Sequence, residues 1–200
     1  MSEIHLSKRD EATRSRREQI VNAAALLFAE RGYHGVTIEE LGGAVGISGP
    51  GIYKHFSSKE AVLAEMLIGI STHLLKQGRR QIDQATSPED ALNRLIDFHT
   101  DFALARPELI RVQEHDLANL SESQAREVRR LQRSYVELWV GVLQEIDPSL
   151  AAAEARSRAH AVFGLLNSTP HSARHGEGPL AGAVLRRMAR AALEVPVLNP

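Results

Sequence analysis

The chain has 200 residues, of which 43% are hydrophobic and 24% are charged, and it contains no cysteine. These values are typical of a globular protein with one large or two small domains, and they exclude disulfide scaffolds, cysteine-ligated metal sites and thiol nucleophiles. Lysine and arginine total 24 against 25 aspartates and glutamates, so the net charge of −1 argues against binding to nucleic acid by bulk positive charge. Because no signal-peptide pattern and no membrane-spanning apolar run is found, we expect a cytoplasmic protein without a membrane partner.

Apolar residues recur at helical spacing along almost the whole chain, and no segment alternates as a strand would. Breakers separate the helical segments: Gly32 follows the first, Pro88 opens another, and Pro107 ends that one. The sequence therefore predicts an all-α fold. Its first part, residues 1–57, holds an N-terminal segment and several short helices, and residues 58–200 form a bundle of longer helices.

Two short helices separated by a glycine turn are predicted between Thr37 and Phe56. Thr37 and Glu40 have the spacing of a capping box, in which a hydroxyl and a carboxylate accept the free N–H groups at a helix start. Gly46 suits the positive φ of a sharp turn, and Ser48 can cap the second short helix. This order of elements is typical of a helix-turn-helix motif.

The second short helix and the start of the next one carry groups that suit contacts with phosphate, namely hydroxyls, a phenol, an amine and free main-chain donors. These residues are Ser48, Tyr53, Lys54, His55, Ser58 and Lys59. A capped helical hairpin without any ligand would have the same spacing. The pattern alone therefore leaves DNA binding and a purely structural hairpin both open.

About residues 15–65 resemble the tetracycline-repressor (TetR/AcrR) family of bacterial regulators. The matching residues are Phe28 to Tyr33, Thr37, Val45 to Ser48, Ile52 to Phe56 and Ser58 to Glu60. The resemblance implies a three-helix DNA-binding head on a helical body that binds an effector and dimerises. It also implies a homodimeric regulator, usually a repressor, that binds near-palindromic operator DNA and is released by a small molecule.

Carried over to this chain, the resemblance places eight residues of the head at DNA. Thr37, Tyr53, His55 and Lys59 would hold the DNA backbone, and Ser48, Gly49, Gly51 and Lys54 would face the major groove. Gly49 and Gly51 depart from the family, because many members carry a longer polar residue there and glycine cannot reach a base edge. Direct readout would therefore rest on Lys54, close backbone approach and DNA shape. Glu39 could accept from a cytosine amine, or it could be a solvated carboxylate of the first helical turn.

The N-terminal arm carries a cluster of basic residues ahead of the first apolar stripe. Arg14 and Arg17 are the best placed of them to contact phosphate or the minor groove from a flexible arm. The alternative is a solvated terminus, since Asp10 and Glu11 offset part of the positive charge.

The middle helices carry the candidate effector-binding residues, which are His99, Phe102, Gln113, Asp116, Tyr135, Trp139 and Asn167. Trp139 and Tyr135 lie one helical turn apart and could line a cavity or form plain core. No tight metal-ligand spacing is present, so we expect neither a metal site nor a cofactor. A faint similarity to actinobacterial members linked to acyl-CoA catabolism points to a small hydrophobic or acyl-CoA-like effector. The arginines within residues 126–133 could bind its phosphates or form a solvated face.

Two apolar segments near the end of the chain, residues 151–166 and 180–193, are predicted to form the dimer interface; the alternative is that they pack only within one subunit. An enzyme is the competing class of function. No phosphate-binding loop, nucleophile elbow or paired-carboxylate motif supports an enzyme, so we predict none. A third possibility is an interaction protein that keeps the fold without binding DNA.

Overall fold

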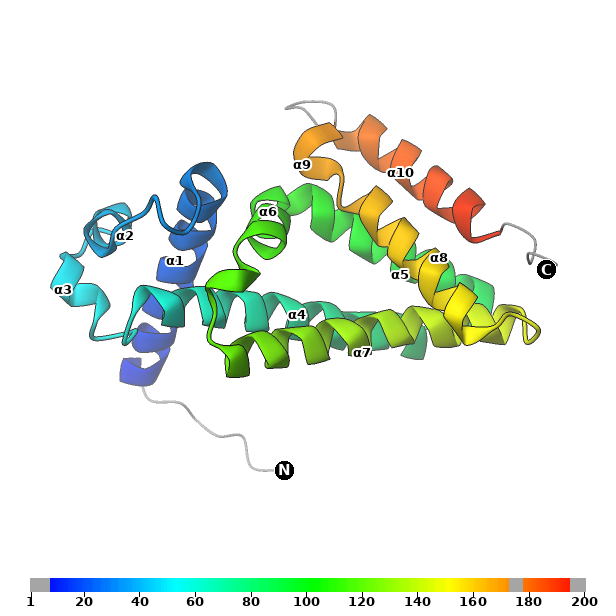
Figure 1. Ribbon diagram of the computed structural model, residues 1–200, viewed down its shortest axis with the longest axis horizontal. Helices are drawn as coiled ribbons and strands as arrows, with labels where there is room; N and C mark the ends of the chain where they lie inside the picture. Colours follow the sequence, from blue (N-terminus) through cyan, green and yellow to red (C-terminus); the bar gives the residue numbers. More distant parts are fainter. Residues whose placement is uncertain (1–7, 173–177, 195–200) are drawn as a thin grey trace. The chain divides into compact units, whose positions relative to one another are not determined.

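The computed structural model describes residues 8–172 and 178–194, and within these ranges every regular element is a helix (Figure 1). In chain order the helices are α1 (Lys8–Arg31), α2 (Ile38–Ala44), α3 (Gly49–Ile52), α4 (Lys59–Asp83), α5 (Pro88–Ala105), α6 (Pro107–His115), the 3-10 helix η1 (Leu117–Asn119), α7 (Glu122–Ile146), α8 (Ala152–Leu166), α9 (Thr169–Ser172) and α10 (Gly178–Leu193). The predicted all-α fold is confirmed.

Contacts along the chain divide it into two compact units. The first comprises residues 1–69 and 111–125, and the second comprises residues 70–110 and 126–200. Helices α4, α6 and α7 have residues in both units. The domain boundary predicted between residues 57 and 58 falls within the first unit and stays a prediction.

The first unit packs α1 against α2 and α2 against α3 around a small apolar core. The side chains that fill this core are Ile20, Phe28, Val36, Leu41, Ile52, Phe56 and Leu63. Helix α1 ends as expected before Gly32, whose φ of +73° is a conformation that glycine adopts without a steric penalty. Because the core is built from all three helices, it fixes the geometry of the helix-turn-helix.

The second unit packs α10 against both α5 and α8, as Figure 1 shows. Ion pairs support this packing, with Arg186 and Arg190 of α10 bound to Asp97 of α5. Helix α5 begins as predicted, with Ser87 as its N-cap and a proline in its first turn. The α8–α10 pair thus belongs to a packed body and leaves a further apolar face exposed.

Helices α4 and α7 approach each other closely within the second unit. A Cβ atom placed on Gly78 of α4 would lie 2.6 Å from Cε2 of Tyr135 in α7 and 3.3 Å from a Leu138 methyl group. No side chain other than hydrogen fits this contact without movement of Tyr135. Gly78 therefore sets the distance between the two helices.

Candidate functional site

The first turn of α2 is held by the capping box that the sequence predicts. The main-chain N–H of Thr37 donates to Glu40 Oε2 at 2.8 Å, and that of Glu40 donates to Thr37 Oγ1 at 3.2 Å. Arg31 binds the other carboxylate oxygen at 2.9 Å. The hydrogen bonds from Thr37, aided by Arg31, lower the pKa of Glu40. These contacts fix where α2 begins.

The turn between α2 and α3 depends on two glycines. Gly46 has a φ of +71°, as the sequence predicts. Gly42 was not predicted to matter, yet a Cβ there would lie 2.7 Å from the main-chain oxygen of Ile47. The N–H of Ile47 in turn donates to the Gly42 oxygen at 2.9 Å, which closes the turn. The sequence signal for this role is a glycine pair inside a seven-residue helix, where glycine is otherwise unfavourable.

The residues at the two ends of α3 present polar side chains to solvent. Ser48 caps the helix by accepting from the Gly51 N–H at 3.3 Å and remains exposed. Tyr53 is 56% exposed, and the exposed Lys54 ammonium has no ion pair within the described residues. These three residues therefore provide a hydroxyl, a phenol and an amine beside the two ends of one short helix. Such a surface can bind phosphate oxygens and base edges.

The two glycines of α3 differ in their surroundings. Gly49 is buried, and a Cβ on it would lie 3.0 Å from Glu39 Oε1. Gly51 is half-buried beside the Ile47 side chain, with its Cβ position 3.3 Å away. The side chain of Glu39 from α2 therefore fills the space beside Gly49, and the predicted place of Gly49 at the major groove stays a prediction.

Lys59 is engaged within the protein. Its Nζ donates to the main-chain oxygens of Tyr33 and Val36, both at 2.7 Å, and lies 4.3 Å from the centre of the Tyr33 ring. The ammonium thereby ties the first residue of α4 to the segment between α1 and α2. Its predicted contact with the DNA backbone stays a prediction.

Arg17 and His55, both predicted at DNA, contact each other. The Arg17 guanidinium donates to the His55 main-chain oxygen, forms an ion pair with Glu65, and lies 4.1 Å from the centre of the Phe56 ring. The His55 ring is half-buried, and its Nδ1 has no hydrogen-bond partner within the described residues. Arg17 thus joins α1 to the segment after α3 and to α4.

The expected flexible arm is helical from Lys8 onward. Arg14 is exposed on α1 and pairs with Glu18 one turn later, at 3.2 Å. Arg16, which was not a candidate, donates to the main-chain oxygen of Val45 at 3.0 Å and so caps the end of α2. The basic cluster therefore includes residues that hold the helix-turn-helix together, and Arg14 remains available at the surface.

Four of the predicted effector residues meet in the second unit, namely His99, Tyr135, Trp139 and Asn167. Nδ1 of His99 lies 3.2 Å from the Tyr135 hydroxyl, and its Nε2 lies 3.0 Å from Oδ1 of Asn167. Burial lowers the pKa of His99 to about 4, against a smaller opposing effect of the Asn167 hydrogen bond, and raises the pKa of Tyr135. The imidazole is therefore neutral at physiological pH.

Aromatic rings pack around this histidine. The ring of Trp139 is fully buried, and its centre lies 5.0 Å from that of Phe163 and 6.2 Å from that of His99. The centre of the Phe102 ring lies 6.3 Å from that of His99, at the margin of the cluster. The indole Nε1 has no acceptor in hydrogen-bond geometry within the described residues. Burial raises the pKa of Tyr135, and the neighbouring Trp139 only partly opposes this effect. The rings of Trp139 and Tyr135 thus pack against their neighbours in the interior of the second unit, and their predicted contact with an effector stays a prediction.

Gln113 and Asp116, the other two candidates, belong to the first unit. Asp116 is buried, and its Oδ1 accepts from the Tyr33 N–H at 3.4 Å and from Asn119 Nδ2 at 3.2 Å. Burial raises the pKa of this carboxyl group. The structure therefore does not bring all seven candidate residues into one site, and Asp116 holds the segment after α1.

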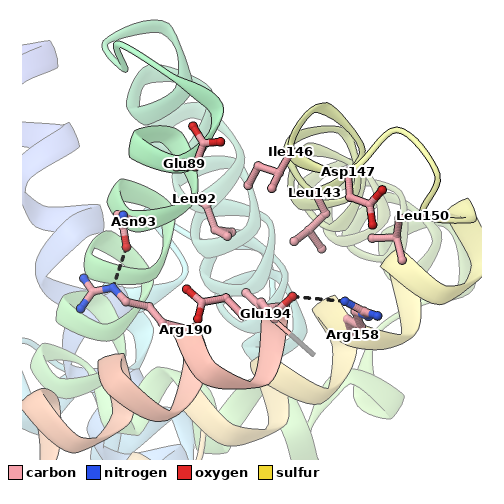
Figure 2. A pocket seen from close by; sticks show the side chains of 11 residues that line it. Glu89, Leu92, Asn93, Leu143, Ile146, Asp147, Leu150, Arg158, Arg190 and Glu194 are labelled. Carbon is pink, nitrogen blue, oxygen red and sulfur yellow. Dashed lines mark hydrogen bonds between the residues drawn. The ribbon is translucent and has the colours of Figure 1, made fainter. Parts of the chain in front are cut away.

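A separate pocket of about 340 Å³ opens among α5, α7, α8 and α10 (Figure 2). Its lining residues are Glu89, Leu92, Asn93, Leu143, Ile146, Asp147, Leu150, Arg158, Arg190, Leu193 and Glu194. Figure 2 shows its two arginines already bound, Arg190 to Asn93 at 2.6 Å and Arg158 to a main-chain oxygen at 3.2 Å. None of the predicted effector residues lines this pocket. Its apolar floor is formed by leucine and isoleucine side chains, and nothing in the sequence distinguishes such residues from ordinary core residues.

An apolar hollow lies on the outer side of α8 and α10. Leu180 is 70% exposed and Met188 is 49% exposed, while Leu165, Val184 and other apolar side chains complete the surface. Exposed apolar surface of this kind is typical of a protein interface. It coincides with the two segments predicted to form the dimer.

No group of three or more metal-ligating side chains occurs within the described residues. Across the same part of the chain, no helix has the length and apolar character needed to cross a membrane.

Comparison with known proteins adds to these observations. A family model described as "Bacterial regulatory proteins, tetR family" matches residues 20–66, and one described as "Tetracyclin repressor-like, C-terminal domain" matches residues 85–171. The transcriptional repressor KstR2 of Rhodococcus jostii (strain RHA1) is 28% identical over 130 residues, or 64% of each chain. The aligned part therefore spans less than two thirds of that relative.

Solved structures share the fold. A TetR-family regulator from Bordetella parapertussis 12822 matches with a TM-score of 0.82 at 24% identity, covering 92% of this chain and 98% of that one. AibR, solved in complex with isovaleryl coenzyme A and operator DNA, matches with a TM-score of 0.75 at 16% identity, covering 86% of this chain and 97% of that one. The prediction that the chain is not an enzyme is confirmed, because the family and these relatives are regulators. The chain belongs to the tetR family of bacterial regulatory proteins.

Proposed function

We propose that this protein is a ligand-responsive transcriptional repressor that binds a near-palindromic operator as a homodimer. The observation that carries the proposal is the helix-turn-helix of α2 and α3, with Ser48, Tyr53 and Lys54 exposed at the two ends of α3. A hydroxyl, a phenol and an ammonium at the ends of a short helix are suited to hold phosphate and to reach into a major groove.

In this proposal the two heads of a dimer insert their α3 helices into successive major grooves, roughly 34–36 Å apart. Thr37 at the start of α2 and Tyr53 at the end of α3 contact the DNA backbone. Arg14 adds a contact from α1. The balanced net charge of −1 limits non-specific affinity, so operator choice depends on these placed contacts and on dimer geometry.

The exposed apolar face of α8 and α10 is the proposed dimer interface. A two-fold interface buries the same patch on both subunits, so Leu180 and Met188 of one copy would pack against α8 and α10 of the other. Burial of these side chains removes apolar surface from water, and this would stabilise the dimer.

The pocket in Figure 2 is the proposed effector site. Its floor of Leu92, Leu143 and Ile146 suits an apolar body, and its volume of about 340 Å³ lies near the lower end for small-ligand pockets. We propose a small hydrophobic or acyl-CoA-like effector whose apolar part enters here. The complex of AibR with isovaleryl coenzyme A supplies the first ligand class to test.

Helix α4 offers a route from effector to head. It runs without a break from Lys59 to Asp83, and its residues belong to both units. A ligand that shifts the second unit would therefore move the start of α4 and change the spacing of the two heads. Coupling of this kind is typically worth about 1–3 kcal/mol.

A binding titration tests the function. Fluorescence anisotropy with DNA from upstream of the protein's own gene should show tight binding that competitor DNA of unrelated sequence does not abolish. Isovaleryl coenzyme A and longer acyl-CoAs, with free coenzyme A as the control, should raise the thermal midpoint of the protein and release the DNA. No binding even at low salt would contradict the proposal and favour an interaction protein that keeps the fold.

A further inference from the structure

We infer that Glu39 is a specificity-determining residue, whose carboxylate accepts a hydrogen bond from a cytosine amine in the major groove. The inference rests on the proposed function, because it needs operator binding through α3. It identifies a reading group on α2 for a recognition helix that contains two glycines.

Glu39 reaches from α2 onto the start of α3. A Cβ atom on Gly49 would lie 3.0 Å from Glu39 Oε1 and 3.3 Å from its Cδ and Cγ atoms. The carboxylate therefore occupies the space into which a side chain at position 49 would project. It stands beside Ser48, the exposed N-cap of α3.

The carboxylate of Glu39 is free to act on another molecule. Glu39 is exposed and makes no ion pair or side-chain hydrogen bond within the described residues. The adjacent Glu40, in contrast, is fully used in the capping box and in its ion pair with Arg31. Of these two neighbouring acidic residues, only Glu39 can contribute to recognition without loss of the helix cap.

The chemistry of a carboxylate selects one base. It only accepts hydrogen bonds, and among the major-groove edges cytosine presents its N4 amine as a donor without an adjacent acceptor on the same base. Guanine and thymine present acceptors that repel the carboxylate. Adenine presents an acceptor next to its amine. A negative charge near phosphate also lowers the affinity for DNA of any sequence. Glu39 would therefore raise selectivity for cytosine while it lowers overall DNA affinity.

The experiment compares base preference in wild type, Glu39→Ala and Glu39→Gln. A library of the operator with each base pair varied is selected by each protein. Wild type should prefer cytosine at one position of each half-site by roughly five- to hundred-fold, the range for one good base contact. Glu39→Ala should lose that preference while binding the remaining positions as before. Glu39→Gln keeps one acceptor and gains a donor, so it should weaken the preference for cytosine and admit adenine. The affinity of both variants for random DNA should rise, because each removes a negative charge.

Two further variants sharpen the test. Glu114→Gln removes the same charge from an exposed residue of α6 and should leave base preference unchanged. Gly49→Ala should displace the Glu39 carboxylate and weaken the same cytosine preference, with no further effect in a Glu39→Ala background. Unaltered selection by Glu39→Ala, with only a lower thermal midpoint, would assign Glu39 a structural role and overturn the inference. Absence of operator binding by wild type would instead overturn the proposed function.

Discussion

Nε2 of His99 lies 3.0 Å from Oδ1 of Asn167, and this contact fixes the tautomer of the ring. An amide oxygen only accepts, so Nε2 carries the hydrogen and Nδ1 is left to accept from the Tyr135 hydroxyl at 3.2 Å. Every polar atom of the buried neutral imidazole is thereby satisfied. The hydrogen bonds connect α5 with α7 and with the end of α8.

This arrangement predicts a pH-dependent stability. Burial holds the pKa of folded His99 at about 4, against 6.5 for the free side chain. Between these values the unfolded chain binds the proton and the folded one does not, so the free energy of unfolding falls as the pH drops. The loss should reach about 3 kcal/mol by pH 4, and urea titrations at a series of pH values would measure it.

His99→Gln is the control for that measurement. Glutamine keeps a donor and an acceptor but does not titrate in this range. Hydrogen bonds lower the pKa values of carboxylates such as Glu40 and Asp90, so their protonation in acid also reduces the free energy of unfolding. This reduction is the same in wild type and variant. The difference between wild type and variant should therefore shrink from pH 6.5 to 4. A constant difference would contradict the assignment to His99.

A second prediction concerns the glycine pair of α2. Gly42→Ala should lower the free energy of unfolding by about 1–3 kcal/mol, because its Cβ would lie 2.7 Å from a main-chain oxygen that cannot move without opening the turn. Gly43→Ala meets nothing within 4 Å and should raise stability by up to about 1 kcal/mol. Chemical unfolding of the two variants side by side checks the contrast, which equal effects would refute.

A third prediction separates two lysines. Lys54→Ala should weaken operator binding and reduce the salt slope by about 1, with the free energy of unfolding unchanged to within about 0.5 kcal/mol. Lys59→Gln should instead lower stability by roughly 1–3 kcal/mol, since it removes the ammonium from two carbonyl oxygens. A fall in salt slope for Lys59→Gln at unchanged stability would assign Lys59 to DNA contact, as the family resemblance implies.

Local chain signals could be interpreted from the sequence because they act over a few residues. The capping box of Thr37 and Glu40, the N-cap at Ser48 and the positive φ of Gly46 each depend on neighbours within one turn, and the structure has all of them. The resemblance to the family likewise depends on a contiguous segment. Helical periodicity correctly predicted the all-α fold, and the resemblance correctly predicted the family.

Contacts between distant segments could not be predicted in this way. Nothing in the sequence indicates that Arg17 binds the His55 oxygen, or that Glu39 lies against Gly49, since both contacts depend on how helices pack. The effector candidates were chosen for their polar and aromatic chemistry, which is equally suited to a satisfied core. The pocket in Figure 2 is floored by ordinary leucines that periodicity can only assign to the interior.

The last prediction concerns the dimer. Replacing both Leu180 and Met188 with glutamate should convert a dimer at micromolar concentration into a monomer, because two charges would enter the proposed apolar interface. Both side chains are exposed in the single subunit, so the double variant should keep its helix content and should still unfold cooperatively on heating. Sedimentation velocity measures the change. Leu26→Glu is the matched control, since Leu26 is 62% exposed on α1, away from α8 and α10 in the chain, and it should leave the dimer intact. Wild-type protein that sediments as a monomer at this concentration would refute the interface, and with it the pairing of two recognition helices on one operator.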